Sequence, residues 1–296
     1  MNGENTMSVE SIKLPTLERQ PMEPRALKSI ILSAITVTSA VIACIPLFSV
    51  LMMLLYRGGK RLSLEVFYAL PPTAFETGGG FGNAILGTLF MVGVAAVISV
   101  PFGVLAASYL AELGPYSKIA QVARFCAKTM TGLPSILAGV FAYAAVVLTM
   151  GSYSAWAGGI ALSILMIPIV MLTAEEAIKM VPRPMKEAAF GMGCTPTQSM
   201  WKVILPVAMP GIMTGVVLAV ARAAGETAPL LFTALFSDYW LRAGEPTASL
   251  AVLIYNYSGM PFENQIELAW TASLVLVLMV FILNIISRTL GRQKRI

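Results

Sequence analysis

The chain has 296 residues, of which 57% are hydrophobic and 12% charged, and its mean hydropathy is +0.79. A soluble domain carries about 25% charged residues, so this composition excludes an ordinary soluble protein and indicates an integral membrane protein. The formal net charge of +5 gives no reason to expect nucleic-acid binding, and the absence of histidine excludes histidine-based catalysis and histidine metal ligation. The three cysteines are too scattered for a disulfide framework or a zinc site.

Six apolar stretches are long enough to cross a bilayer, which takes about 20 helical residues. They cover about residues 29–56, 85–111, 131–150, 155–174, 207–236 and 266–287. We therefore predict an all-α integral membrane protein with six transmembrane helices in one membrane domain, residues 29–290. In this prediction residues 1–28 form a polar cytoplasmic tail, and residues 291–296 form a short basic tail.

The distribution of lysine and arginine predicts the orientation, because these residues accumulate in cytoplasmic connections. The termini and the connections around residues 112–130 and 174–203 are rich in both, whereas the opposite side carries only Arg57, Lys60, Arg61 and Arg242. Both termini are therefore predicted to be cytoplasmic, in a multi-pass protein of the bacterial cytoplasmic membrane. The basic group that ends the first stretch is either an interfacial stop at lipid phosphates or a rim that attracts anions.

Charged residues at the cytoplasmic ends of the stretches are interpreted as solvated or as facing lipid headgroups. This interpretation covers Lys118, Arg124 and Lys128 before the third stretch, and Glu175 and Glu176 after the fourth. The third stretch itself opens at residues 131–135, where a proline followed by serine suits the start of a helix.

The external connections are rich in glycine and aromatic residues. Gly78–Gly80 predicts a turn-rich loop packed against the membrane face. After the fifth stretch, Tyr239 and Trp240 suit an interfacial belt or a lip that meets a partner.

The longest polar insertion, residues 174–203, predicts a helix–glycine–helix elbow at the membrane surface. Glu187–Met192 is expected to form a short helix with Glu187 in its first turn, near the positive end of the helix dipole. Gly193 breaks this helix, and a second segment, Thr195–Lys202, leads into the fifth stretch. Such an elbow can sit in a groove on a soluble partner; the alternative is an amphipathic connector without a partner. The chain has no GxxxxGK[ST] phosphate loop, so ATP hydrolysis is not expected on it.

The fifth stretch contains two charged residues, Arg222 and Glu226, four positions apart. A single helix over Gly211–Phe236 would place both on one face, with Arg222 about 16 Å from its start and near the middle of the bilayer. A charge at that depth costs at least about 2.5 kcal/mol and usually faces a protein interior or an aqueous path. This pair is therefore the candidate for contact with a transported ion.

Small residues share the helix face of Arg222. The residues that recur with Arg222 at three- and four-residue steps are Gly211, Gly215, Leu218 and Gly225. This spacing predicts a close contact with another helix, and the arginine would point into that contact. Pro229 lacks a backbone donor and is expected to kink or end the helix. The alternative is an internal ion pair that only fixes helix packing, although a buried pair is weak evidence for stability.

The polar insertion resembles the EAA loop of the permease subunits of ABC importers. That loop has Glu-Ala-Ala, three residues, Gly, nine residues, and then Ile-x-Leu-Pro. This chain matches the spacing, with Val203 in place of the isoleucine. The resemblance implies coupling to a separate ATPase through Glu187, Ala188, Ala189, Gly193, Leu205 and Pro206.

Over residues 29–290 the chain also resembles phosphate permease subunits of the PstA type. The resemblance rests on Pro71-Pro72 with Gly78–Gly80 and Asn83, on Gly132–Ile136, and above all on Ala221–Leu231. It implies a type I ABC importer permease that moves inorganic phosphate by alternating access, with its EAA-type coupling loop at about residues 182–206. Many relatives carry an arginine where this chain has Leu172, so no role of that arginine transfers.

The resemblance further implies a substrate path and partners. The path would contain Arg222 and Glu226, with Thr227 and Ser135 as auxiliary donors. A guanidinium suits phosphate because it is always charged and offers a planar fork of donors. The implied partners are a homologous PstC-type permease, a dimer of PstB-type ATPase subunits, an external PstS-type phosphate-binding protein and membrane lipid. No cofactor is implied on this chain, because ATP and magnesium would bind to the ATPase.

Three alternatives remain open on the residues alone. The first is a permease for another oxyanion, such as molybdate or sulfate, which would also suit a lone arginine. The second is a stand-alone secondary transporter, which leaves the elbow without a purpose. The third is an intramembrane enzyme, against which the absence of histidine and of a carboxylate pair within the stretches both argue.

Overall fold

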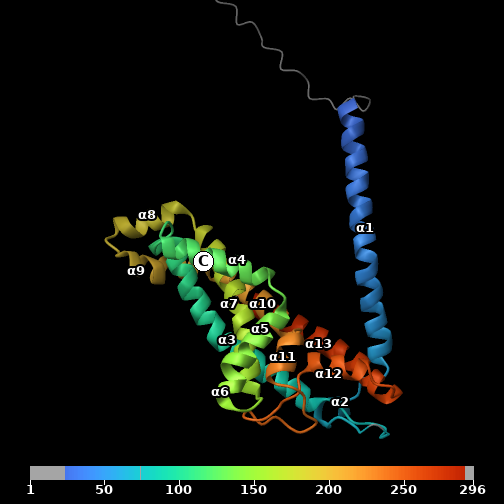
Figure 1. Cartoon of the computed structure of the whole chain (residues 1–296). Coiled ribbons are helices and arrows are strands. Elements are labelled where there is room, and N and C mark those ends of the chain that lie inside the picture. The colour runs from blue at the N-terminus through green and yellow to red at the C-terminus, as the bar shows by residue number, and fades with distance from the viewer. Residues whose placement is uncertain (1–23, 74, 291–296) are drawn as a thin grey trace, which may run out of the picture. The chain divides into compact units, whose positions relative to one another are not determined.

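The computed structural model describes residues 24–73 and 75–290, which fold into helices joined by loops (Figure 1). The predicted C-terminal tail and residues 1–23 of the predicted N-terminal tail lie outside the described residues. Helix α1 spans Pro24–Gly59, so residues 24–28 of the predicted tail are helical. Proline suits this first helical position because its missing N–H has no partner there in any helix.

The chain divides at Met52 into two compact units. The first unit ends with most of α1, whose apolar window is 0% buried. A helix that is apolar on every side needs lipid or another protein around it. The apolar surface of α1 is therefore available for contacts outside its own unit.

The second unit contains twelve further α-helical segments and three π-helical turns among its described residues. In chain order they are α2 (Glu65–Tyr68), α3 (Gly82–Ser108), η1 (Tyr109–Leu113), α4 (Lys118–Gly132), α5 (Ser135–Ala142), η2 (Tyr143–Val147), α6 (Leu148–Met150), α7 (Ala155–Lys179), α8 (Arg183–Gly191), α9 (Pro196–Ser199), η3 (Met200–Ile204), α10 (Leu205–Ala224), α11 (Ala228–Thr233), α12 (Leu250–Ser258) and α13 (Glu263–Leu290).

Five described helices are long and apolar enough to span a membrane, and a bent pair supplies a sixth span if it is counted as one. The pair consists of α4 and the helix from α5 to α6, and the chain bends by 108° between them at Leu133-Pro134. The third predicted stretch, residues 131–150, therefore starts a few residues too early: residues 131 and 132 end the amphipathic helix α4, and α5 begins at Ser135. The bend follows from Pro134, which disfavours helical backbone in the residue before it.

Three long helices, α3, α7 and α10, form the centre of the second unit. Their buried side chains include Met91, Leu162 and Ile212. Small residues bring the backbones close together: a Cβ added to Gly211 would lie 2.8 Å from the Cβ of Ala177, and one added to Gly215 would meet Thr173 at 2.1 Å. The two glycines thus form a helix contact with α7, as their spacing predicts.

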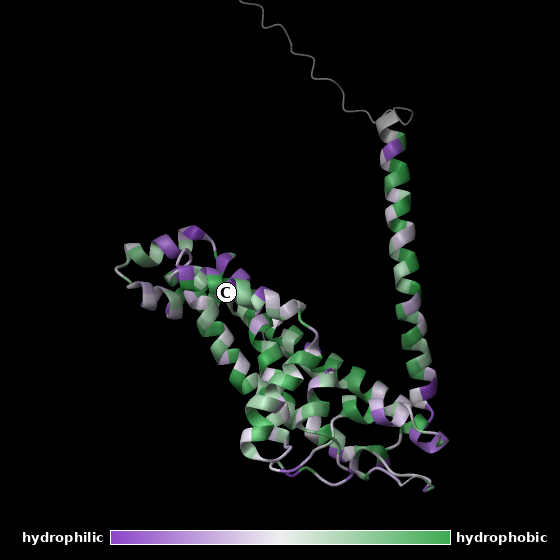
Figure 2. Cartoon of the chain, in the orientation of Figure 1, coloured by the Kyte–Doolittle hydropathy of each residue, from purple (hydrophilic) through white to green (hydrophobic). Residues whose placement is uncertain are grey.

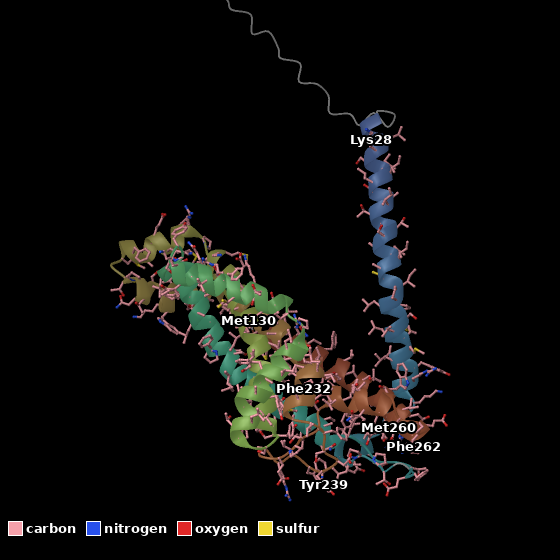
Figure 3. The ribbon with its side chains drawn as sticks, viewed as in Figure 1. Lys28, Met130, Phe232, Tyr239, Met260 and Phe262 are labelled. Atoms are coloured by element: carbon pink, nitrogen blue, oxygen red, sulfur yellow. The ribbon has the colours of Figure 1, made fainter. Side chains whose placement is uncertain are left out.

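The two ends of the second unit differ in character (Figures 1 to 3). Helices α8 and α9 lie at one end, where hydrophilic residues are concentrated, and the loop with Tyr239 lies at the other. At that second end α12 packs against α13, and the glycine loop packs tightly: a Cβ on Gly80 would lie 2.6 Å from the carbonyl oxygen of Val66. Helix α12 is too short to be evident from the sequence pattern.

We expect Gly87→Ala to destabilise the second unit, because the new Cβ would lie 1.9 Å from the backbone carbonyl oxygen of Ala248. Overpacking against backbone costs about 1–3 kcal/mol. Gly93→Ala on the same helix is the matched control, since nothing lies within 4 Å of its added Cβ. Thermal unfolding of the purified protein would measure the midpoints of both variants. Equal midpoints would show that Gly87 and the backbone of Ala248 are not in close contact.

Candidate functional site

The charged pair of the fifth stretch forms at the end of α10. Arg222 lies in the last turn of this helix, and Glu226 follows the cap residue Gly225. The Nε atom of Arg222 donates to Oε1 of Glu226 at 3.4 Å. The arginine side chain is 47% exposed and the glutamate 15% exposed, so the pair opens to one side of the chain.

The structure corrects the predicted extent of the helix that carries Arg222. A continuous helix runs over Pro196–Ala224, so the arginine lies near its end and not halfway along a helix that reaches Phe236. The cause is local. Gly225 caps the helix, and Pro229 occupies the first turn of the separate helix α11. A proline is favourable at that position and incompatible with a continuing helix interior.

Within this chain the predicted helix contact does not extend to Arg222. The buried face of α10 carries Ala219 and Ala223, whereas Leu218 is 60% exposed and shares the outer face with Arg222. Only the first half of the predicted seam, Gly211 and Gly215, packs against α7. Arg222 therefore points away from the chain's own core, toward water, lipid or a second protein.

Helices α5 and α11 pack together next to the charged pair. A Cβ on Gly139 would lie 2.7 Å from the Cα of Pro229, so the two helices are in close contact there. Ser135 is the first residue of α5, and Thr227 precedes α11. Among the described residues neither hydroxyl makes a side-chain hydrogen bond, so both remain available as donors.

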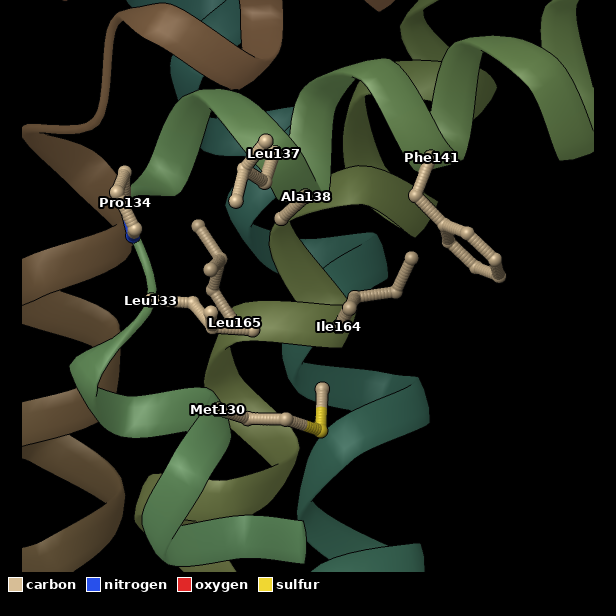
Figure 4. Close-up of a pocket in the computed structure, with 8 residues that line it drawn as sticks. All are labelled: Met130, Leu133, Pro134, Leu137, Ala138, Phe141, Ile164 and Leu165. Carbon is tan, nitrogen blue, oxygen red and sulfur yellow. The ribbon is translucent and has the colours of Figure 1, made fainter.

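A second face of α5 borders an apolar groove of about 340 Å³ (Figure 4). Its walls include Met130 of α4, Leu137 and Phe141 of α5, and Ile164 of α7. All its lining side chains are apolar, so it offers no group that would bind an anion. The charged candidate site is thus separate from the groove, which lies at the inner side of the α4–α5 bend.

The predicted elbow is present as α8, Gly193 and α9, here called the α8–α9 elbow (Arg183–Ser199). Gly193 has φ +83°, a left-handed conformation that favours glycine at the end of a helix. Thr195 and Gln198 then form a capping box at the start of α9. Helix α8 begins at Arg183, so Glu187 lies in its second turn. The prediction that Glu187 lies in the first turn was wrong.

The α8–α9 elbow exposes apolar side chains around the EAA residues. Phe190 and Met192 are both exposed at its tip. Glu187 and Ala188 are exposed beside them, whereas Ala189 is buried and anchors the helix. Past the elbow, Leu205 is buried and Pro206 partly buried at the start of α10. Exposed apolar groups on a polar end of a protein mark a contact surface.

A buried carboxylate behind the elbow was missed by the sequence interpretation. Glu175 is 1% exposed, and its Oε1 accepts from Arg124 Nε at 2.7 Å and from Lys179 Nζ at 2.8 Å. Arg124 also donates to the carbonyl oxygens of Leu110 at 2.6 Å and Pro115 at 2.8 Å. Solvation was therefore the wrong interpretation for both Arg124 and Glu175; Glu176, at 71% exposed, is solvated as expected.

The helical period contains a signal for this burial. Glu175 falls in the series Met171, Ala174, Glu175 and Ile178, all of which are buried on one face of α7. Leu172 is partly buried against the small cluster around Leu110, so the chain has an apolar contact there. The three-way contact of Glu175 fixes α4 and the segment after α3 to the end of α7.

Comparison with known proteins identifies the family. Residues 99–296 match the family of binding-protein-dependent transport system inner membrane components. The phosphate transport system permease protein PstA of Haemophilus influenzae is 41% identical over 259 residues, which cover 87% of this chain and 91% of that protein. PstA 1 of Mycobacterium tuberculosis H37Rv is 32% identical over 95% of this chain and 94% of its own length. The chain belongs to the PstA permease family.

Solved structures agree on the fold of this PstA family member. A chain of a bacterial alginate ABC transporter superposes with a TM-score of 0.65, at 16% identity, over 92% of this chain and 98% of that chain. A chain of the MetNI methionine ABC transporter superposes with a TM-score of 0.58, at 23% identity, over 71% of this chain and 93% of that chain. The type I ABC importer permease fold and the multi-pass location in the inner membrane, both predicted from the sequence, are confirmed.

Proposed function

We propose that this chain is the permease subunit of an ATP-driven importer that moves inorganic phosphate across the cytoplasmic membrane. The observation that carries the proposal is the Arg222–Glu226 pair at the end of α10, with Arg222 exposed on the outer face of the helix, in a chain whose relatives are named phosphate permeases. A permease needs a cationic group that a passing anion reaches from an aqueous path. Arg222 meets this need because its side chain is turned away from the core.

The chemistry of the pair suits a transient contact with phosphate. The guanidinium stays charged and presents a fork of donors to two phosphate oxygens. Glu226 occupies one donor, Nε, when no anion is present. It would compete with phosphate for the arginine and so weaken the contact. An anion can then enter and leave, whereas a bare arginine would hold it.

The proposed protein partners correspond to three surfaces of the chain. A homologous PstC-type permease would face the outer side of α10 and complete the path. A dimer of PstB-type ATPase subunits would receive the α8–α9 elbow, so that ATP and magnesium act there and not on this chain. A PstS-type phosphate-binding protein would dock at the other end, where Tyr239 is exposed (Figure 3). In this arrangement both termini and the α8–α9 elbow lie on the cytoplasmic side. Closure of the ATPase dimer would move the elbow and, through it, α10, so that Arg222 would be exposed to the two sides of the membrane in turn.

Uptake of labelled phosphate tests the proposal. Cells that lack their own permease subunit would express this chain with its partners, and uptake would be followed with excess sulfate or molybdate. We expect uptake that needs an active ATPase and resists both competitors. Uptake of molybdate or sulfate in place of phosphate would show that the chain transports another oxyanion. Uptake that persists with an inactive ATPase would instead establish a secondary transporter.

We expect Gly193→Val to uncouple the ATPase from transport. Its φ of +83° costs a β-branched residue more than about 1 kcal/mol, so the turn between α8 and α9 would change shape. The ratio of phosphate moved to ATP hydrolysed would fall. Gly191→Val is the control, because Gly191 is exposed with open space around it and has no left-handed backbone. Unchanged coupling in Gly193→Val, with the ATPase bound normally, would argue against a role for the elbow.

A further inference from the structure

A polar cleft of about 750 Å³ lies at the root of the α8–α9 elbow. Its walls come from the segment after α3, from α4, from the end of α7 and from the start of α8. Four cationic side chains line it: Arg124, Lys179, Arg183 and Lys186. Glu112 is the one carboxylate among the lining residues. None of these four cations belongs to the proposed phosphate path.

The carboxylates around the cleft do not neutralise all of its cations. Arg124 and Lys179 share a single buried carboxylate, Glu175. Lys186 pairs with Glu112 on the wall. Glu176 contacts Lys179 at 3.2 Å but is directed into solvent. Among the described residues Arg183 makes no ion pair, so its charge is in excess at the mouth of the cleft.

The geometry also favours an anion of a particular kind. Arg124 is held by three acceptors, so its charge stays fixed on the wall. The free guanidinium of Arg183 offers a planar fork, and Tyr116 and Gln121 add a hydroxyl and an amide to the lining. A tetrahedral oxyanion carries enough acceptors to use donors from several walls at once.

We propose that this cleft binds a phosphoryl oxyanion, either free inorganic phosphate or the phosphate of an anionic lipid headgroup. The bound anion connects α4 and α7 with α8, and it therefore restrains the elbow relative to the membrane helices. Binding at the cleft does not depend on which ion the permease transports. Its test is therefore separate from the test of the transport function.

Equilibrium binding of labelled phosphate to the assembled complex in nanodiscs of zwitterionic lipid tests the proposal. All samples would carry Arg222→Gln, which removes the proposed path site. We expect saturable binding that Arg183→Gln weakens at least tenfold. Lys128→Gln is the matched control, because Lys128 is an exposed cation of α4 that does not line the cleft. Folding is not at risk in Arg183→Gln, since the side chain is exposed and has no ion pair to lose.

Nanodiscs containing phosphatidylglycerol distinguish the two sources of phosphate. If a headgroup occupies the cleft, this lipid abolishes phosphate binding and co-purifies with the complex unless Arg183→Gln is present. If free phosphate is the occupant, binding is the same in both lipids. The proposal is overturned if an intact complex binds phosphate and retains phosphatidylglycerol equally with and without Arg183→Gln.

Discussion

Arg222→Gln is expected to reduce the initial rate of phosphate uptake about 10- to 100-fold. The substitution keeps the length and polarity of the side chain but removes its charge and its bidentate fork. A hydrogen bond to a charged group contributes about 1.5–3 kcal/mol, which corresponds to that range. Because the side chain is 47% exposed and outside the core, the loss would not come from misfolding.

Two further variants make the Arg222 result specific. Arg222→Lys keeps the charge without the planar fork and is expected to retain an intermediate rate. Glu226→Gln removes the competitor and is expected to lower both the half-saturating phosphate concentration and the maximal rate, since release becomes slower. Uptake would be normalised to the amount of ATPase subunit that co-purifies with the chain. Unchanged uptake in Arg222→Gln would show that the Arg222–Glu226 pair has a structural role only.

Glu175→Gln is expected to destabilise the chain by about 3–5 kcal/mol. Breaking a buried pair leaves the partner charge uncompensated, and Glu175 serves two cations at once. Arg124 is the more affected of the two, because it is fixed among backbone carbonyls and cannot move into water without releasing them. Lys179 is 43% exposed and would be solvated again at little cost.

Thermal unfolding of the purified complex measures this effect, and the neighbouring residue provides the control. Glu176→Gln changes the same chemistry one position away at an exposed site, where substitutions usually stay within about 0.5 kcal/mol. The double variant Arg124→Gln with Glu175→Gln should recover part of the loss, since the Arg124 charge that Glu175→Gln leaves unpaired is then removed as well. Equal unfolding midpoints for Glu175→Gln and Glu176→Gln would show that the buried pair contributes nothing.

The elbow could be predicted from sequence because its signals are local. Gly193 follows a short helical segment, and Thr195 and Gln198 stand three residues apart, which is the pattern of a capping box. The length of each apolar stretch likewise predicted the helices α3, α7 and α13. These features depend on neighbouring residues only, so one sequence contains them completely.

Two features of the candidate site needed the folded chain. Pro229 predicted a break in the fifth apolar stretch, but the end of α10 at Ala224, with Gly225 as its cap, is not visible in the hydropathy. The helical period of α7 indicates the burial of Glu175 but not its pairing with Arg124, 51 positions away. The role of the outer face of α10 follows neither from local sequence signals nor from the fold of this chain alone, because its partner is expected on another chain.

The most direct test of a path along α10 is the reaction of Leu218→Cys with a charged, membrane-impermeant thiol reagent in the assembled complex. Cys44, Cys126 and Cys194 would first be replaced by serine, and Ala219→Cys on the buried face is the control. A path predicts that Leu218→Cys reacts, that its rate changes when the ATPase is trapped closed, and that Ala219→Cys stays unreactive. A Leu218→Cys that never reacts would place this face in lipid or in a dry subunit interface, and would contradict a phosphate path beside Arg222.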